Sequence, residues 1–304
     1  MNAQPPIVLT GAAGFIGRRV AARLAAAGAR VLAVDRMPKP AGLPAGVDYR
    51  RADLGAGPDW IPEDLRAGFV LAHLAWNMNR ADRAAQEASA VDFARLLESA
   101  SARGLRGVAG LGSAEEYGER EGRLREDLAP GARLSAYGRA KHEAGRALEA
   151  WARGAPDRRA FWLRPFVVYG PGQGGSMAIP YALQCARART PAEFSEGLQR
   201  RDFVHVDDVA EGIARAARRI AEPGEPFAAC NLGRGEPVRL RDVLERIARR
   251  THAEELFRFG ARPLRANEPQ EQFADVAAAE KGLGWRARIS WETGVDELCG
   301  EGGP

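Results

Sequence analysis

Cysteine is scarce in this chain of 304 residues: there are only three, at positions 185, 230 and 299, and none forms a CxxC pair. Their odd number and wide spacing favour free thiols in a reducing compartment over a disulfide framework. The four histidines are equally dispersed. Because no cluster has the spacing of metal ligands, the sequence predicts no metal site.

Long apolar runs are also missing. No stretch approaches the roughly 20 apolar residues that a membrane-spanning helix needs, so we expect no membrane partner. The opening residues Met1–Pro6 lack the basic and apolar parts of a signal peptide. A composition of 45% hydrophobic and 28% charged residues is typical of a globular chain. We therefore expect a cytoplasmic protein.

Neither sign of charge dominates, because 44 basic residues stand against 40 acidic ones, giving a net charge of +4. The two signs are interspersed, and Arg-rich stretches such as 214–219 fall on helical patterns, which favours solvated helix faces. A nucleic-acid footprint would need basic residues clustered with aromatic partners, so we expect no nucleic-acid partner. A mild basic balance also suits an anionic cofactor and an anionic substrate.

The first two-thirds of the chain alternates short apolar runs with longer amphipathic ones, which is the pattern of βαβ units. It predicts an α/β fold with a Rossmann-type, doubly wound parallel sheet over residues 1–170, rejoined by about 201–250. Residues 171–200 and 251–304 are then mainly a smaller, interleaved substrate-binding region. Strands are expected at 7–10, 30–35, 47–50, 69–73, 106–111, 160–169 and 230–233, and helices at 15–28, 82–103, 135–153, 207–220 and 239–250.

A glycine-rich loop, Thr10–Gly17, follows the first expected strand and precedes the first expected helix. Gly11 permits a tight turn, Gly14 lets a pyrophosphate approach the backbone, and Gly17 lets the helix pack closely on the sheet. The start of the helix, at Phe15 and Ile16, offers free N–H groups and a favourable dipole to phosphate. A glycine triplet in this context indicates a dinucleotide cofactor.

Asp35 ends the second expected strand, close to the spacing at which an acid accepts hydrogen bonds from the adenosine ribose hydroxyls. Its negative charge repels a 2′-phosphate and favours NAD(H). Arg36 follows it directly, and Arg18 and Arg19 stand beside the loop, where arginines suit a 2′-phosphate. NADP(H) is therefore the alternative cofactor, and an acidic turn residue without a ligand is the alternative for Asp35.

Tyr137 and Lys141 stand at i and i+4 of an expected helix, so both side chains lie on one helical face. A tyrosine titrates near 10 in water, and a fixed positive charge nearby stabilises its ionised form. Tyr137 is thus suited to exchange a proton with a substrate hydroxyl near neutral pH, and Lys141 to hydrogen-bond the nicotinamide ribose. Such a pair occurs by chance on many helices, and its place after the fifth strand of a cofactor-binding sheet favours function.

With these motifs the sequence resembles the extended short-chain dehydrogenases/reductases of the NAD-dependent epimerase/dehydratase family, which modify nucleotide sugars. The resemblance runs over nearly the whole chain. It rests on the glycine loop, the Tyr–Lys pair and six further segments: Asp53-Leu54, His73–Ala75, Gly112–Gly118, Arg164–Gly172, Arg201–Asp208 and Leu283–Trp285.

The resemblance implies roles for further residues. Ser113 would complete a catalytic triad with Tyr137 and Lys141, and Glu115 is the carboxylate beside it. Arg201 would contact the substrate phosphates, although a surface arginine is the alternative. The remaining cofactor contacts implied are Asp53, Leu54, Leu74, Ala75 and Pro165. Trp76 stands where family members commonly have small residues, so we place it, together with Ser113, Glu115 and Arg201, at an unusual substrate surface.

The resemblance implies an NAD(P)-dependent enzyme that acts at C4 of a nucleotide sugar. Members that act as 4,6-dehydratases carry an Asp–Glu pair directly after the catalytic Ser or Thr, whereas this chain has Ala114 and Glu115. We therefore favour an NDP-4-keto-6-deoxyhexose reductase, with an NDP-hexose C4 epimerase as the alternative. A reductase of a small non-sugar carbonyl and a non-catalytic NAD(P)-binding regulator are further alternatives. Family members commonly pair through two helices, so we expect a homodimer formed by the helices at 82–103 and 135–153.

Overall fold

The computed structural model describes residues 4–174, 177–264 and 267–300. Its centre is a parallel sheet of seven strands in the order β12-β7-β5-β4-β1-β2-β3. The chain builds outwards from β1 to β3, returns to β4 and then builds in the opposite direction, which confirms the predicted doubly wound Rossmann fold. These strands are β1 (Ile7–Thr10), β2 (Val31–Asp35), β3 (Val47–Arg51), β4 (Phe69–His73), β5 (Leu105–Leu111), β7 (Arg159–Pro165) and β12 (Phe227–Leu232).

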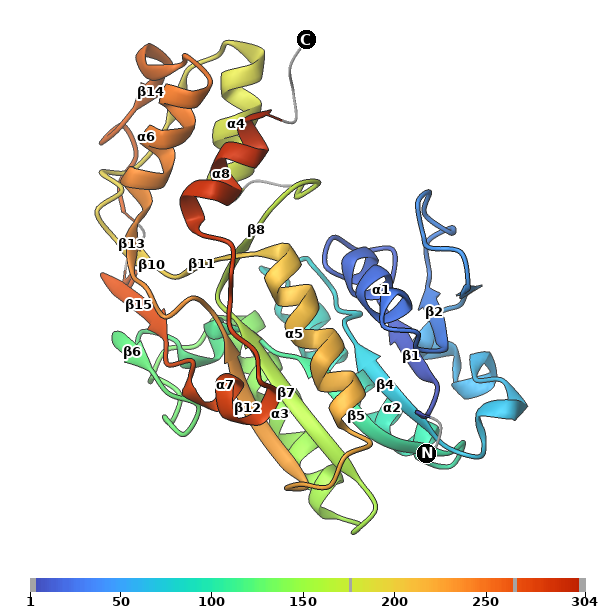
Figure 1. Cartoon of the computed structure of the whole chain (residues 1–304). Helices are drawn as coiled ribbons and strands as arrows, with labels where there is room; N and C mark the ends of the chain where they lie inside the picture. Colours follow the sequence, from blue (N-terminus) through green and yellow to red (C-terminus); the bar gives the residue numbers. More distant parts are fainter. Residues whose placement is uncertain (1–3, 175–176, 265–266, 301–304) are drawn as a thin grey trace.

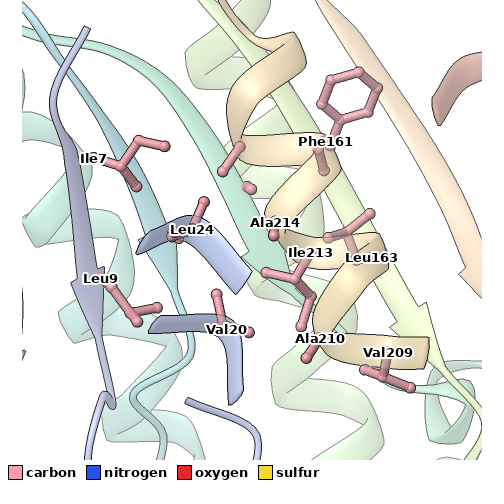
Figure 2. Close-up of a cluster of buried hydrophobic side chains, with 14 of the residues drawn as sticks. Ile7, Leu9, Val20, Leu24, Phe161, Leu163, Val209, Ala210, Ile213 and Ala214 are labelled. Carbon is pink, nitrogen blue, oxygen red and sulfur yellow. The ribbon is translucent and has the colours of Figure 1, made fainter. Parts of the chain in front are cut away.

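Helices cover both faces of this sheet (Figure 1). One face carries α1 (Gly17–Ala26), α5 (Val206–Arg219) and α7 (Ala277–Leu283), and the other carries α2 (Arg83–Ser101) and α3 (Ala136–Arg153). Figure 2 shows the first face, where Val20 and Leu24 of α1 and Ile213 of α5 pack over the sheet. Because both faces are covered, all four residues of β1 are buried, which explains its uninterrupted apolar sequence.

A smaller unit stands beyond the carboxyl ends of the central strands (Figure 1). Its helices, α4 (Ala178–Ala188), α6 (Leu240–Arg250) and α8 (Trp291–Gly300), share a separate apolar core that includes Leu183, Leu244 and Val295. Its short strands form a sheet in the order β13-β10-β15-β6 and the pair β14-β9. They are β6 (Gly122–Leu124), β9 (Ala192–Glu193), β10 (Arg200–Arg201), β13 (Val238–Arg239), β14 (Phe257–Arg258) and β15 (Glu271–Ala274).

The strand expected at 160–169 is in fact two strands. Pro165 ends β7 and has no N–H to continue the ladder, and after Phe166 the chain leaves the central sheet. The following residues form β8 (Val167–Tyr169), which pairs in parallel with β11 (Phe203–His205).

The boundaries expected between the two regions also differ from the packing. The chain leaves the large domain after β12, because the apolar face of α6 packs on α4 and α8 instead of on the central sheet. Conversely, α7 and Trp285, expected in the substrate-binding region, pack on the large domain beside α5.

Over the part of the chain that the structure describes, no helix is long and apolar enough to cross a membrane. The same residues contain no group of three or more His, Cys, Asp or Glu side chains that could hold a metal ion. The three cysteines are free thiols.

Trp285 anchors the C-terminal segment on the large domain. Its side chain is buried, its ring packs against Gly212 of α5, and its Nε1 donates a hydrogen bond to the Asp208 carbonyl at 2.9 Å. Trp285→Ala is expected to lower the free energy of unfolding by about 3–5 kcal/mol, because it leaves a cavity. Trp285→Phe keeps most of the apolar contact and should lose clearly less. Urea denaturation measures both, and equal small losses would show that the anchor lies elsewhere.

Candidate functional site

The predicted glycine loop joins β1 to α1, and the backbone around Gly11 and Gly17 leaves no room for a side chain. Gly11 has a φ of 71°, and a Cβ there would lie 2.7 Å from the Ala75 nitrogen. A Cβ at Gly17 would lie 2.0 Å from the Gly11 carbonyl oxygen. Only glycine fits either position, so the turn is tight and the helix begins directly against the strand. The loop thereby also lies against Leu74 and Ala75, as the predicted cofactor site requires.

The start of α1 fits a diphosphate. Within the described residues, the N–H groups of Phe15 and Ile16 have no acceptor, and the first helical turn carries no acidic side chain. A Cβ at Gly14 would meet only the Gly11 carbonyl oxygen within 4 Å, so one side of the loop is open. Free donors at a helix N-terminus are suited to bind an anion.

The carboxylate of Asp35 is fixed beside this loop at the carboxyl end of β2. One oxygen accepts a hydrogen bond from the Ala13 N–H at 2.9 Å, and the other accepts from the Met37 N–H at 3.0 Å. Each oxygen retains a lone pair for a ribose hydroxyl. Arg36 is exposed, whereas Arg19 is held by an ion pair with Asp207 at 3.1 Å.

Asp53 and Leu54 follow β3, one strand further from the glycine loop than Asp35. Asp53 caps a short 3-10 helix, η1 (Leu54–Ala56), by accepting from the Gly55 N–H at 3.0 Å. Pro165 is buried at the carboxyl end of β7. All three therefore lie at the edge of the sheet where parallel strands of this fold bind their ligands.

Ser113, Tyr137 and Lys141 come together at the carboxyl end of β5. Ser113 caps the short helix η4 (Ala114–Tyr117) and lies near enough to Tyr137 for its side chain to lower the pKa of that hydroxyl. The Lys141 Nζ lies 5.8 Å from the centre of the Tyr137 ring and donates to the Leu111 carbonyl at 2.7 Å. Tyr137 is 6% exposed and Lys141 is 2% exposed, so water is largely excluded from the pair.

Burial controls the protonation of this pair. It raises the pKa of Tyr137 to about 12, a shift that the Glu115 charge reinforces and the Arg80 charge opposes. Burial also lowers the pKa of Lys141 to about 7. Tyr137 is therefore protonated at neutral pH, and stabilising its ionised form is the task of the surrounding cations.

Trp76, predicted to face the substrate, contacts Lys141. The Lys141 Nζ lies 3.7 Å from the centre of the indole ring, a close cation–π contact. The indole Nε1 donates to the Gln86 side chain at 2.8 Å, and Gln86 is fully buried. Its amide nitrogen donates in turn to the carbonyls of Asn77 and Asn79 at 3.0 and 2.9 Å. These hydrogen bonds to Gln86 fix the loop after β4 next to Lys141.

Arg80, on the same loop, was not predicted as a site residue. Its guanidinium carbon lies 4.4 Å from the centre of the Tyr137 ring. Its Nη1 donates a hydrogen bond to Glu115 at 2.7 Å. Arg80 therefore lies between Tyr137 and Glu115, which was predicted as a site residue. The unusual sequence at 76–79 marks the loop, but no sequence signal indicates which side chain turns towards Tyr137.

Glu116 is a second residue that sequence reasoning missed. It is 2% exposed and accepts hydrogen bonds from the Ser113 N–H at 2.8 Å, the Trp162 Nε1 at 3.0 Å and the Arg164 Nε at 2.9 Å. Its donors come from the turn that carries Ser113 and from β7, two segments that no local sequence pattern connects.

Arg201 lies apart from the catalytic group, on β10 of the small sheet. Its Nη2 donates to Glu268 at 3.0 Å, and its side chain is only 14% exposed. Burial lowers the pKa of Arg201, and the Glu268 charge opposes that shift. Glu268 stands 67 residues further along the chain, so no local sequence pattern pairs it with Arg201.

Comparison with known proteins agrees with this geometry. Residues 7–233 match the model of the family described as the NAD dependent epimerase/dehydratase family. A UDP-glucose 4-epimerase of Streptomyces lividans is 29% identical over 91% of this chain and 90% of its own length. A CDP-abequose synthase of Salmonella muenchen is 28% identical, over 47% of this chain and 48% of its own length.

Solved structures show the same relation. MoeE5 in complex with UDP-glucose and NAD has a TM-score of 0.84 and 30% sequence identity, over 97% of both chains. MoeE5 in complex with UDP-glucuronic acid and NAD has a TM-score of 0.83 at the same identity. The predicted resemblance, the enzyme class and the NAD dependence are thereby confirmed. The chain belongs to the NAD dependent epimerase/dehydratase family of nucleotide-sugar enzymes.

Proposed function

We propose that this protein is an NAD-dependent C4 epimerase of a nucleotide hexose. The observation that carries the proposal is the buried group of Ser113, Tyr137 and Lys141 beside the glycine loop. It provides a hydrogen-bond donor, a proton-transfer group and a cation at one point on the sheet edge, which is what hydride transfer at a carbinol carbon needs. Arg201 on β10 and its partner Glu268, in the segment before β15, are the proposed contacts of the nucleotide.

Each residue of the group has a distinct task in this mechanism. Tyr137 takes the proton of the C4 hydroxyl when that carbon is oxidised and returns it when the carbon is reduced on its other face. Ser113 holds the reacting oxygen, and Lys141, whose Nζ lies 5.8 Å from the centre of the Tyr137 ring, binds the nicotinamide ribose. Bound NAD supplies the acceptor and donor of hydride. The surrounding burial keeps solvent protons from the reacting oxygen.

The relatives support the epimerase over the reductase that the sequence favours. Two relatives that match over most of this chain are named 4-epimerases: the Streptomyces lividans UDP-glucose 4-epimerase and a dTDP-L-rhamnose 4-epimerase of Burkholderia thailandensis, 27% identical over 96% of this chain. The CDP-abequose synthase matches under half of it. An intact triad argues against the non-catalytic regulator, which needs only the cofactor loop.

The NDP-4-keto-6-deoxyhexose reductase is the second candidate. It is favoured by the sequence after Ser113, where Ala114 replaces the acid that a 4,6-dehydratase needs, and reduction requires only a proton from Tyr137. At neutral pH Tyr137 is protonated, which suits that direction. A reductase of a small non-sugar carbonyl has no such observation in its favour.

A substrate panel separates the candidates. Purified protein with NAD is incubated with UDP-, dTDP- and CDP-hexoses, and the products are analysed for the C4 epimer. In parallel, a 4-keto-6-deoxy nucleotide sugar with NAD(P)H is followed at 340 nm. Epimer formation without net cofactor oxidation is the expected result. Oxidation of NAD(P)H without epimerisation would establish the reductase instead.

Tyr137→Phe supplies the matched control for that panel. It keeps the ring and removes the hydroxyl, so nucleotide-sugar binding should persist while turnover falls at least about a hundredfold. Calorimetric titration checks the binding. Near-normal turnover in this variant would contradict the proposed role of Tyr137.

Asp35 is proposed to select NAD over NADP. Asp35→Ala removes both the ribose acceptor and the repelling charge, so NAD affinity should fall about tenfold and rejection of NADP should relax, in line with the loss of one or two hydrogen bonds to a charged group. Fluorescence titration with both cofactors measures this. Asp48→Ala, which removes an exposed carboxylate on neighbouring β3, is the control and should bind NAD normally. A wild-type preference for NADP would refute the role of Asp35.

We also propose a homodimer through α2 and α3. These two helices pack side by side on one face of the sheet, and Val91 on α2 is 49% exposed. The expected result in light scattering at micromolar concentration is a dimer. Val91→Glu should shift the equilibrium towards the monomer, because a charge would be buried in the interface. A strictly monomeric wild type would contradict the proposal.

A cytoplasmic location remains a prediction.

A further inference from the structure

We propose that Arg80 and Glu115 form a charge pair that positions the Tyr137 ring and tunes the ionisation of its hydroxyl. Its role in turnover rests on the proposed function, whereas the tuning itself is a property of the folded protein. The pair connects the loop after β4, the turn after β5 and the first turn of α3, which are the three segments around Tyr137.

The contacts form a continuous chain. Arg80 lies over the Tyr137 ring at 4.4 Å, nearer than Lys141 at 5.8 Å, and donates to one oxygen of Glu115 at 2.7 Å. The other Glu115 oxygen accepts from the Ser135 hydroxyl at 2.9 Å, and Ser135 caps α3 by accepting from the Gly138 N–H at 2.9 Å. The helix that carries Tyr137 is thus tied to the pair.

The close contact between α3 and η4 makes this arrangement stiff. A Cβ on Gly138 would lie 2.3 Å from the Glu115 carbonyl oxygen, so the backbones of the two segments touch. A shift of Glu115 is therefore transmitted to the first turn of α3. Tyr137 lies in that turn.

Arg80 is the permanent cation at this site. The charged groups that face Tyr137 are Arg80 from the loop, Glu115 and Glu116 from η4, and Lys141 from its own helix. Because burial lowers the pKa of Lys141 to about 7 and raises that of Tyr137 to about 12, the Lys141 ammonium has already lost its proton in the alkaline range where tyrosinate forms. A guanidinium stays charged throughout that range. Arg80 thus favours the ionised ring, and Glu115 opposes it.

The test reads Tyr137 directly in NAD-loaded protein that carries tyrosine labelled with ¹³C at Cζ. The resonance of Tyr137 is identified by its loss in Tyr137→Phe, and its chemical shift is followed against pH. Arg80→Gln removes the cation and should raise the pKa of Tyr137 by about one unit, whereas Glu115→Gln removes the anion and should lower it by a similar amount. The double variant should return towards the wild-type value.

Arg83→Gln is the matched control. It removes the same charge three residues further on, where Arg83 is 81% exposed and pairs with Glu87 at 2.6 Å. It should leave the Tyr137 titration unchanged. Equal titrations in Arg80→Gln and Arg83→Gln, or shifts of the same sign in Arg80→Gln and Glu115→Gln, would overturn the proposal.

Turnover provides an independent readout. If the proposed epimerase activity is present, the acid limb of its pH profile should move upwards in Arg80→Gln and downwards in Glu115→Gln, following the NMR values. A profile that stays in place while the NMR values move would overturn the link to catalysis. The NMR titration needs no substrate. Absence of epimerase activity would therefore refute the proposed function, whereas the effect of Arg80 and Glu115 on the pKa of Tyr137 would still be decided by the NMR titration.

Discussion

One buried carboxylate, Glu116, holds the carboxyl ends of β5 and β7 together. It receives hydrogen bonds from the turn after β5 and from Trp162 and Arg164 on β7. A buried charge is tolerated only when it is paired and hydrogen-bonded, and here three donors satisfy it. The backbone packs tightly around this carboxylate, because a Cβ on Gly112 would lie 2.5 Å from the Glu116 Oε1. Ser113 can occupy its position because this network fixes the backbone beside it.

The second constraint is the burial of a lysine. An ammonium without water is destabilised, and Lys141 is compensated by the Leu111 carbonyl, the face of Trp76 and the charge of Glu116. A small residue in place of Trp76 would leave the ammonium without its aromatic contact. The unusual sequence after β4 thus supplies an aromatic face to Lys141. The same burial that makes Lys141 easy to deprotonate increases the importance of Arg80 as a cation.

The sequence predicts a feature of the structure well when residues close together in the chain determine that feature. The glycine loop and the Tyr–Lys pair each depend on a few neighbouring residues and a strand or helix beside them, so the fold class, the family and the meeting of Ser113 with Tyr137 were predictable. The place of α6 was not, because an amphipathic helix does not indicate which apolar surface it covers. Neither was the contact between Arg80 and Tyr137, since it joins residues 57 positions apart across an irregular loop. Trp76 shows the same limit: its unusual size was visible, but not that its ring would lie against Lys141.

The two units of the protein are joined beside Ser113. The turn that carries Ser113 continues into β6, and β6 belongs to the small sheet together with β15 and β10. Gln272 of β15 donates hydrogen bonds to the carbonyls of Gly118 and Arg120 at 2.8 and 2.7 Å, directly after that turn. Arg201 stands on β10, opposite Gln272 in the strand register. A ligand that bound Arg201, as proposed, would therefore be held in position relative to Ser113 by paired strands and not by a flexible linker. Such coupling allows insertions in the small unit to change the nucleotide or sugar while the reacting groups keep their geometry.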